Sequence, residues 1–179
     1  GEIAPSMVKE LAQYVLIGHS ERRKLFGETE VLIHKKLVAA HQVGLTPLLC
    51  VGAIVREKQG TISPFVEKEL EQQLKNCLTG ISFSNKEKLV IVYEPEEAIG
   101  TGAAFDPKRS GHICYFIGRQ LDHMFGGAVA ASIPLLYGGS VTSANANVFL
   151  QEKDIDGLLV GSASLDVNEF LRIVNITKS

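Results

Sequence analysis

The sequence has few features of a membrane, secreted or nucleic-acid-binding protein. None of its apolar runs approaches the roughly 18–20 residues that cross a bilayer. No basic leader followed by an apolar stretch and a small-residue cleavage site is recognisable at its start. The net charge of −2 comes from 18 basic and 20 acidic residues spread along the chain, so no basic stripe suggests nucleic acid or a membrane surface as a partner. We therefore expect a small-molecule ligand.

Cysteine is also scarce, and its spacing is uninformative. Cys50, Cys77 and Cys114 are an odd number of thiols at wide intervals. This pattern argues against a disulfide framework or a zinc site. The histidines show no partner spacing that suggests another metal. We expect reduced thiols, no bound metal and a cytoplasmic location.

What the sequence does contain is a regular alternation of two kinds of segment. Short apolar runs of strand length end in Gly, Pro or polar clusters. These runs are Tyr14–Ile17, Leu45–Val51, Leu89–Tyr93, Ile133–Tyr137 and Ile155–Val160. Longer stretches with helical spacing lie around them. They are Ala4–Ala12, Glu30–Val43, Pro64–Leu78, Asp106–Met124, Ser143–Gln151 and Asp166–Ile176.

This alternation predicts an α/β protein built from right-handed βαβ units around a parallel sheet. Strands with almost no internal charge are typical of sheets that are covered on both faces. No linker or low-complexity tract divides the chain, so residues 1–179 are expected to form a single domain. An open doubly wound sheet and part of an eight-stranded α/β barrel both fit five strands.

Polar and glycine-rich clusters follow the predicted strands directly. His19 follows one strand and Glu94 another, while Gly138–Val141 and Gly161–Ser164 follow the last two. Because the carboxyl ends of parallel strands lie at one face, these groups are expected to share a site. Backbone N–H groups of glycine-rich loops suit an anion such as phosphate. The alternatives are tight turns for the loops, a structural role for the histidine and a capping or ion-pairing role for the glutamate.

Several of these segments resemble, in order and at family spacing, the strand-end motifs of the triosephosphate isomerase family. They are Tyr14–Arg23 with Phe26–Glu28, Pro47–Gly52, Tyr93–Pro95 with Ala98–Gly102, and Tyr137–Val141 with Asp156–Gly157 and Leu159–Leu165. The resemblance implies a TIM barrel of which this chain holds strands four to eight. It also implies that the domain is incomplete at its N-terminus and lacks the first three strands.

The resemblance further implies a cytoplasmic enzyme of glycolysis and gluconeogenesis. This isomerase would interconvert dihydroxyacetone phosphate and D-glyceraldehyde 3-phosphate without a cofactor. Glu94 would be the base that moves a proton between two carbons, and His19 the neutral electrophile on the carbonyl. Glu21 would be a nearby hydrogen-bonding carboxylate, and Ser20 would help to orient the site.

The same resemblance places a phosphate site, a lid and a dimer. Phosphate would be held by the backbone N–H groups of Gly100, Ser140, Gly161 and Ser162. The segment that follows the catalytic glutamate would close over the substrate and exclude water. Its residues are Pro95, Glu96, Glu97, Ala98, Ile99, Thr101 and Gly102. Family members are usually homodimers, so a homodimer is expected.

The chain also departs from the family pattern. Nothing corresponds to the Asn-x-Lys strand, whose lysine neutralises the substrate phosphate. Glu96 and Glu97 stand where the family usually has Val and Trp, and Ala53 and Gly118 replace a usual Glu and Arg. An alternative to the enzyme is therefore a catalytically impaired fragment or paralogue that binds phosphorylated ligands or assembles with another chain.

Overall fold

The described residues form a sheet of five parallel strands. The computed structural model describes residues 3–53, 62–82, 89–95 and 106–176. Its strands are β1 (Tyr14–Ile17), β2 (Thr46–Val51), β3 (Val90–Tyr93), β4 (Leu135–Tyr137) and β5 (Gly157–Leu158). Each strand pairs in parallel with the next. The predicted α/β fold with a parallel sheet is confirmed.

The strand order distinguishes between the two architectures that the alternation of elements allows. The order β1-β2-β3-β4-β5 contains no reversal within the described sheet. A doubly wound sheet reverses direction at the switch point where its ligand binds, whereas the strands of an α/β barrel are added in one direction. The observed order favours the barrel arrangement.

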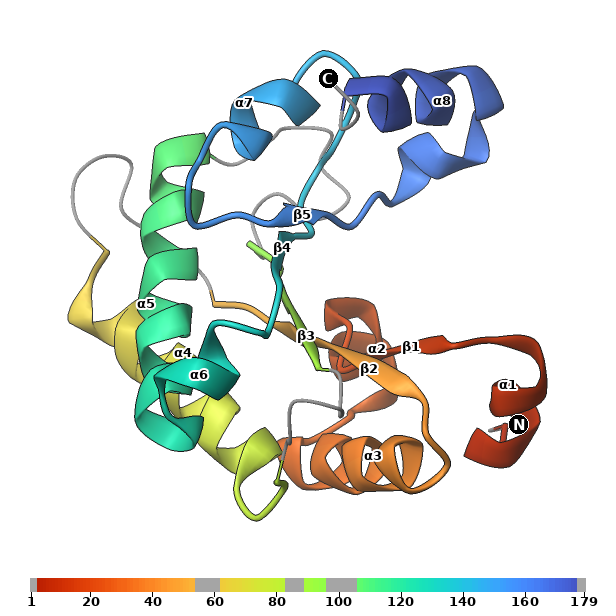
Figure 1. Cartoon of the computed structure of the whole chain (residues 1–179), viewed down its shortest axis with the longest axis vertical. Helices are drawn as coiled ribbons and strands as arrows, with labels where there is room; N and C mark the ends of the chain where they lie inside the picture. Colours follow the sequence, from red (N-terminus) through yellow and green to blue (C-terminus); the bar gives the residue numbers. More distant parts are fainter. Residues whose placement is uncertain (1–2, 54–61, 83–88, 96–105, 177–179) are drawn as a thin grey trace.

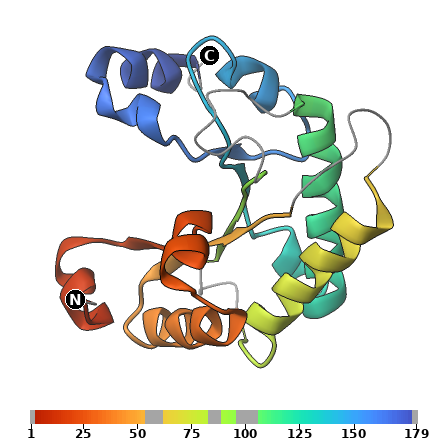
Figure 2. The ribbon, with the colours of Figure 1, turned by 180° about the vertical axis from the view of Figure 1, so that it is seen from behind.

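Eight helices are described, and the larger part of them forms an arc outside this sheet. They are α1 (Pro5–Leu11), α2 (Ser20–Phe26), α3 (Glu30–Gln42), α4 (Pro64–Leu78), α5 (Pro107–Phe125), α6 (Gly127–Ala130), α7 (Ala146–Leu150) and α8 (Val167–Ile176), with a 3₁₀ turn η2 (Ser162–Leu165). Helices α3, α4, α5, α7 and α8 contact one another in that order. The arc is visible from both sides of the molecule (Figure 1, Figure 2).

The two faces of the sheet differ in burial. One row of paired residues lies in the core shared with the helices and is at most 9% exposed. This row consists of Ile17, Leu49, Ile91 and Leu135. In the adjacent row on the other face, Leu16 is 40% exposed, and its partners Leu48 and Val90 are half-buried. The sequence predicted cover on both faces. On this second face the cover by described residues is partial, because Cys50 and Val92, two positions further along β2 and β3, are fully buried.

In helix α4 the sequence explains where the helix begins, but apolar character alone does not predict which side chains are buried. Pro64 stands at its first turn, where the missing N–H costs nothing. Phe65 is apolar, but its side chain is 68% exposed. Val66 is buried instead, since it lies four residues before the buried Leu70.

Element boundaries differ from the prediction mainly at the carboxyl half of the chain. The last predicted strand covered Ile155–Val160, but β5 contains only Gly157 and Leu158. The short helices α2 and α6 carry too few residues for a recognisable apolar period. No helix in the described part of the chain is long and apolar enough to span a bilayer.

The difference between the two faces predicts different costs for two neighbouring truncations in β2. Leu49→Ala removes a fully buried side chain and should lower the free energy of unfolding by about 2–5 kcal/mol. Leu48→Ala removes a half-buried side chain from the other face and should cost less than about 2 kcal/mol. Urea unfolding of the two variants measures both values. Equal losses would contradict the assignment of the faces.

Candidate functional site

His19 stands at the junction of β1 and α2. Gly18, directly before it, has a φ of +79°, a left-handed conformation that favours glycine. This turn makes His19 the N-cap of α2, where Nδ1 accepts the backbone N–H of Glu21 at 3.3 Å. Because Nδ1 is an acceptor, a neutral imidazole carries its proton on Nε2. His19 can therefore donate from Nε2.

Glu94 follows β3 directly and extends its pairing. Its backbone N–H donates to the carbonyl of Val51 at 2.8 Å. The side chain is only 2% exposed, although it carries a carboxylate. Its Oε2 accepts the backbone N–H of Ser20, the first residue of α2, at 3.0 Å. The first N–H groups of a helix have no partner within the helix, and here one of them donates to a buried carboxylate.

The imidazole and the carboxylate lie next to each other. His19 Nε2 is 3.1 Å from Glu94 Oε1. No N–H or O–H of the described residues donates a hydrogen bond to Oε1, and the buried Oγ of Ser20 likewise has no partner there. Burial raises the pKa of the Glu94 carboxyl, while the charge of His19 and the Ser20 N–H oppose this rise. The pair therefore combines a carboxylate of raised basicity, Glu94, with an adjacent hydrogen-bond donor, His19 Nε2.

Two glycines of the neighbouring strand ends leave room for Glu94. A Cβ on Gly52, after β2, would lie 2.2 Å from the Glu94 carbonyl oxygen. A Cβ on Gly138, after β4, would lie 2.5 Å from Val92 Cγ1 and 3.3 Å from Glu94 Cγ. Glycine is therefore required at both positions for the backbones to approach this closely.

Arg23 holds the ends of β1 and β2 together beneath this pair. Its Nε donates to the carbonyl of Gly18 at 2.7 Å, and an Nη donates to the carbonyl of Cys50 at 3.1 Å. The three cysteines are buried and form no disulfide. Burial and the nearby Glu94 carboxylate raise the pKa of the Cys50 thiol, which keeps that thiol protonated.

The loop after β4 carries the predicted phosphate contact Ser140. Asn145 fixes this loop, since its amide donates to the Ser140 carbonyl at 2.9 Å and accepts the Thr142 N–H at 2.8 Å. Glu169 of α8 accepts the N–H of Ser143 at 2.6 Å. Neither Asn145 nor Glu169 was identified from the sequence, because each is one polar residue in a polar context.

The predicted site residues fall into three groups. His19, Ser20 and Glu94 are brought together, and the exposed Glu21 contributes its backbone N–H to His19. Three of the predicted phosphate contacts lie within the described residues. Their backbone N–H groups donate to no described residue, as an anion site requires. These candidates are Ser140, Gly161 and Ser162. Among the described residues, no hydrogen bond or ion pair connects Gly161 or Ser162 with the His19–Glu94 pair.

Most of the predicted lid cannot be placed. Gly100 and the lid residues Glu96, Glu97, Ala98, Ile99, Thr101 and Gly102 lie outside the described residues. Pro95, the first lid residue, is buried directly after Glu94. Within the described ranges, no group of three His, Cys, Asp or Glu side chains could hold a metal ion.

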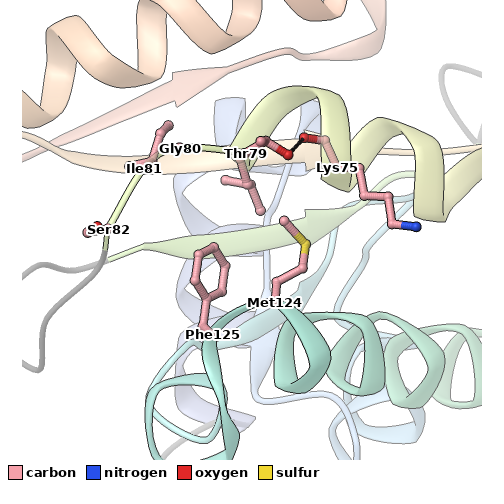
Figure 3. Close-up of a pocket in the computed structure, with 8 residues that line it drawn as sticks. Lys75, Thr79, Gly80, Ile81, Ser82, Met124 and Phe125 are labelled. Atoms are coloured by element: carbon pink, nitrogen blue, oxygen red, sulfur yellow. Dashed lines mark hydrogen bonds between the residues drawn. The ribbon is translucent and has the colours of Figure 1, made fainter.

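A cavity of about 670 Å³ lies at the opposite end of the sheet. It is lined by the end of α4, the following residues Thr79–Ser82 and the end of α5. In Figure 3, Met124 and Phe125 extend from α5 toward the end of α4. The amino ends of β3 and β4 are on this side, so the cavity is separate from the His19–Glu94 pair.

Comparison with known proteins gives one consistent result. The family model described as triosephosphate isomerase matches residues 1–177. A protein named triosephosphate isomerase from Dehalococcoides mccartyi is 45% identical over 97% of this chain and 66% of its own length. Proteins of the same name from Carboxydothermus hydrogenoformans and Aquifex aeolicus are 42% identical over 97% of this chain and over 68% and 69% of their own lengths. The chain spans about two thirds of the length of these curated relatives.

The close approach at Gly138 predicts opposite effects of the same substitution at two sites. Gly138→Ala forces a methyl group against Val92 and should lower the free energy of unfolding by about 1–3 kcal/mol. Gly118→Ala in α5 meets only Leu135 Cδ1 at 3.5 Å and should raise it by about 0.4–1 kcal/mol. Thermal and urea unfolding check both signs. A neutral Gly138→Ala would show that the strand ends are not this close.

Proposed function

The chain belongs to the triosephosphate isomerase family, and from this premise we propose that it interconverts dihydroxyacetone phosphate and D-glyceraldehyde 3-phosphate. The reaction moves one proton between two adjacent carbons, through an enediolate. It needs a base that reaches carbon-bound protons and a donor that polarises a carbonyl. No redox step occurs, and the chemistry requires no cofactor.

The observation that carries the proposal is the His19–Glu94 pair. Glu94 is buried, and its Oε1 accepts no hydrogen bond from an N–H or O–H of the described residues. His19 Nε2 lies 3.1 Å from that oxygen, and Nδ1 is occupied by the Glu21 N–H. A substrate that replaces this direct contact would meet a base at Oε1 and a donor at Nε2.

The proposed steps balance in protons. Glu94 takes the proton from the carbon beside the carbonyl, while the Nε2–H of His19 hydrogen-bonds to the carbonyl oxygen and stabilises the developing negative charge. Glu94 then returns a proton to the former carbonyl carbon. The hydroxyl on the other carbon loses its proton as its carbonyl forms, and the former carbonyl oxygen gains a proton, so His19 Nε2 would carry one proton between the two oxygens. Burial supports this role, because a raised pKa makes Glu94 a stronger base than an exposed carboxylate.

The substrate phosphate is assigned to the strand-end loops. The N–H groups of Ser140, Gly161 and Ser162 would donate to it, joined by Gly100 from outside the described residues. Asn145 supports this role because it fixes the Ser140 carbonyl and leaves the N–H of that residue available. Residues 95–102 would close over the bound triose and exclude water from the enediolate.

The proposed architecture is a TIM barrel in which β1 to β5 are strands four to eight of a single domain, residues 1–179. Two observations support it: the unreversed strand order and the half-exposed apolar row that includes Leu16 and Leu48. Such a row is what three further strands would cover in a closed barrel. A cytoplasmic homodimer acting in glycolysis and gluconeogenesis is proposed from family membership.

A second candidate is a family member that binds phosphorylated ligands or assembles with another chain without turnover. The exposed apolar side of β1 favours it, since Tyr14 is 53% and Leu16 40% exposed. An edge strand with such side chains is a ready partner for another strand. In that case the His19–Glu94 pair would remain without catalysing isomerisation.

Substitution of the base tests the enzyme proposal. Glu94→Gln keeps the size and the acceptor for the Ser20 N–H but removes the basic oxygen, so kcat for glyceraldehyde 3-phosphate should fall about 10²–10⁴-fold. Glu71→Gln, an exposed carboxylate of α4 paired with Lys75, is the matched control and should leave kcat unchanged. A coupled assay of isomerisation gives both rates.

The assay is run with the protein alone and with a segment of a curated relative that supplies the Asn-x-Lys strand. Turnover in either arm that depends on Glu94 supports the isomerase. Binding of a phosphate-bearing analogue with no turnover in both arms would contradict it and support the second candidate.

A further inference from the structure

Gln73 is a buried polar residue on an otherwise apolar helix face. It lies on α4 and is 9% exposed, among the buried side chains Leu70, Leu74 and Cys77. A primary amide buried at such a position costs free energy unless its donor and acceptor are both paired. The partners of this amide therefore indicate why a polar residue occupies the helix face.

Both partners belong to one residue, Gly52. Gln73 Oε1 accepts the Gly52 N–H at 3.1 Å, and Nε2 donates to the Gly52 carbonyl at 2.6 Å. Only one orientation of the amide satisfies both bonds, so the side chain acts as a peptide group added beside the end of β2. This two-point contact fixes both the position and the tilt of the Gly52 backbone.

Gly52 in turn lies against the backbone of Glu94. A Cβ on Gly52 would come within 2.2 Å of the Glu94 carbonyl oxygen, so the two chains are in close contact. The preceding Val51 accepts the Glu94 N–H at 2.8 Å. A shift of Gly52 is therefore transmitted to Glu94 through both the contact and the strand pairing.

We propose that Gln73 is a positioning residue for Glu94, acting through Gly52 from the far side of β2. The expected effect on catalysis rests on the proposed function. The expected effect on the position of Glu94 does not. Gln73 touches neither His19 nor the site where a substrate would bind. Its effect on catalysis is through the placement of the base, to which proton transfer is sensitive at the scale of 1 Å.

The test replaces the amide with an apolar side chain of similar length. Gln73→Met keeps the volume and removes both hydrogen bonds. Amide hydrogen exchange at Gly52 and Glu94 should become at least about 10-fold faster. In the isomerase assay kcat should fall about 10-fold or more with KM within about twofold, because the base is displaced while the phosphate contacts remain.

Three further variants separate positioning from loss of stability. Gln72→Met, at the preceding and exposed position of α4, removes only a bond to Asn76 and should change neither exchange nor kcat. Gly52→Ala should reproduce the kcat loss of Gln73→Met by pushing Glu94 directly. Gln73→Glu keeps an acceptor for the Gly52 N–H, so its kcat should lie between those of the wild type and Gln73→Met. It also provides the test if Gln73→Met does not fold.

Two outcomes would overturn the proposal. One is faster exchange at Gly52 with unchanged exchange at Glu94, which would make Gln73 a local cap of β2. The other is equal loss of kcat in Gln73→Met and Gln72→Met. If the wild type shows no isomerisation, the proposed function fails, while the exchange at Glu94 still decides whether Gln73 positions it.

Discussion

Glu94 places a carboxylate, only 2% exposed, at the end of β3, and the groups around it offset part of the loss of its hydration. Ser20 gives it a backbone N–H at 3.0 Å, and His19 gives it a neighbouring imidazole nitrogen at 3.1 Å. One oxygen remains without a hydrogen bond from an N–H or O–H of the described residues, and burial raises the pKa of the carboxyl. A fully satisfied carboxylate would be a weak base, and an exposed one would be solvated. The observed arrangement avoids both, which suits removal of a carbon-bound proton.

The surrounding backbone follows from this placement. Gly52 and Gly138 flank Glu94 from the neighbouring strands, and neither position has room for a side chain. Gly18 turns the chain so that His19 caps α2, and Arg23 ties that turn to β2. Gln73 of α4 holds the flanking Gly52 through two hydrogen bonds to its backbone. The geometry of one carboxylate thus depends on the ends of four strands, β1 to β4, and on two helices, α2 and α4.

The sequence predicted much of this, and its failures have identifiable causes. The strand β1 and the helix α4 have the predicted bounds, because each combines a clear apolar pattern with a clear terminator. His19 and Glu94 were predicted to share a site, since parallel strands bring their carboxyl ends to one face, and the family resemblance added Ser20. Gln73 was missed, although a polar residue on the buried stripe of a helix is a detectable signal. Glu169 gave no such signal, because the fold alone brings Ser143 near it. Asn145 bonds the backbone of its own loop, and one polar residue in a polar loop does not stand out in the sequence.

The central claim is that Glu94 is a buried carboxyl whose pKa is raised and which interacts with His19. A ¹³C NMR titration of the Glu94 side-chain carboxyl, assigned by comparison with Glu94→Gln, measures this in the folded protein without substrate. We predict a midpoint above the ordinary value of 4.5, and a change in the His19 imidazole resonances over the same pH range. A midpoint at or below 4.5, with His19 resonances that do not respond, would contradict the account.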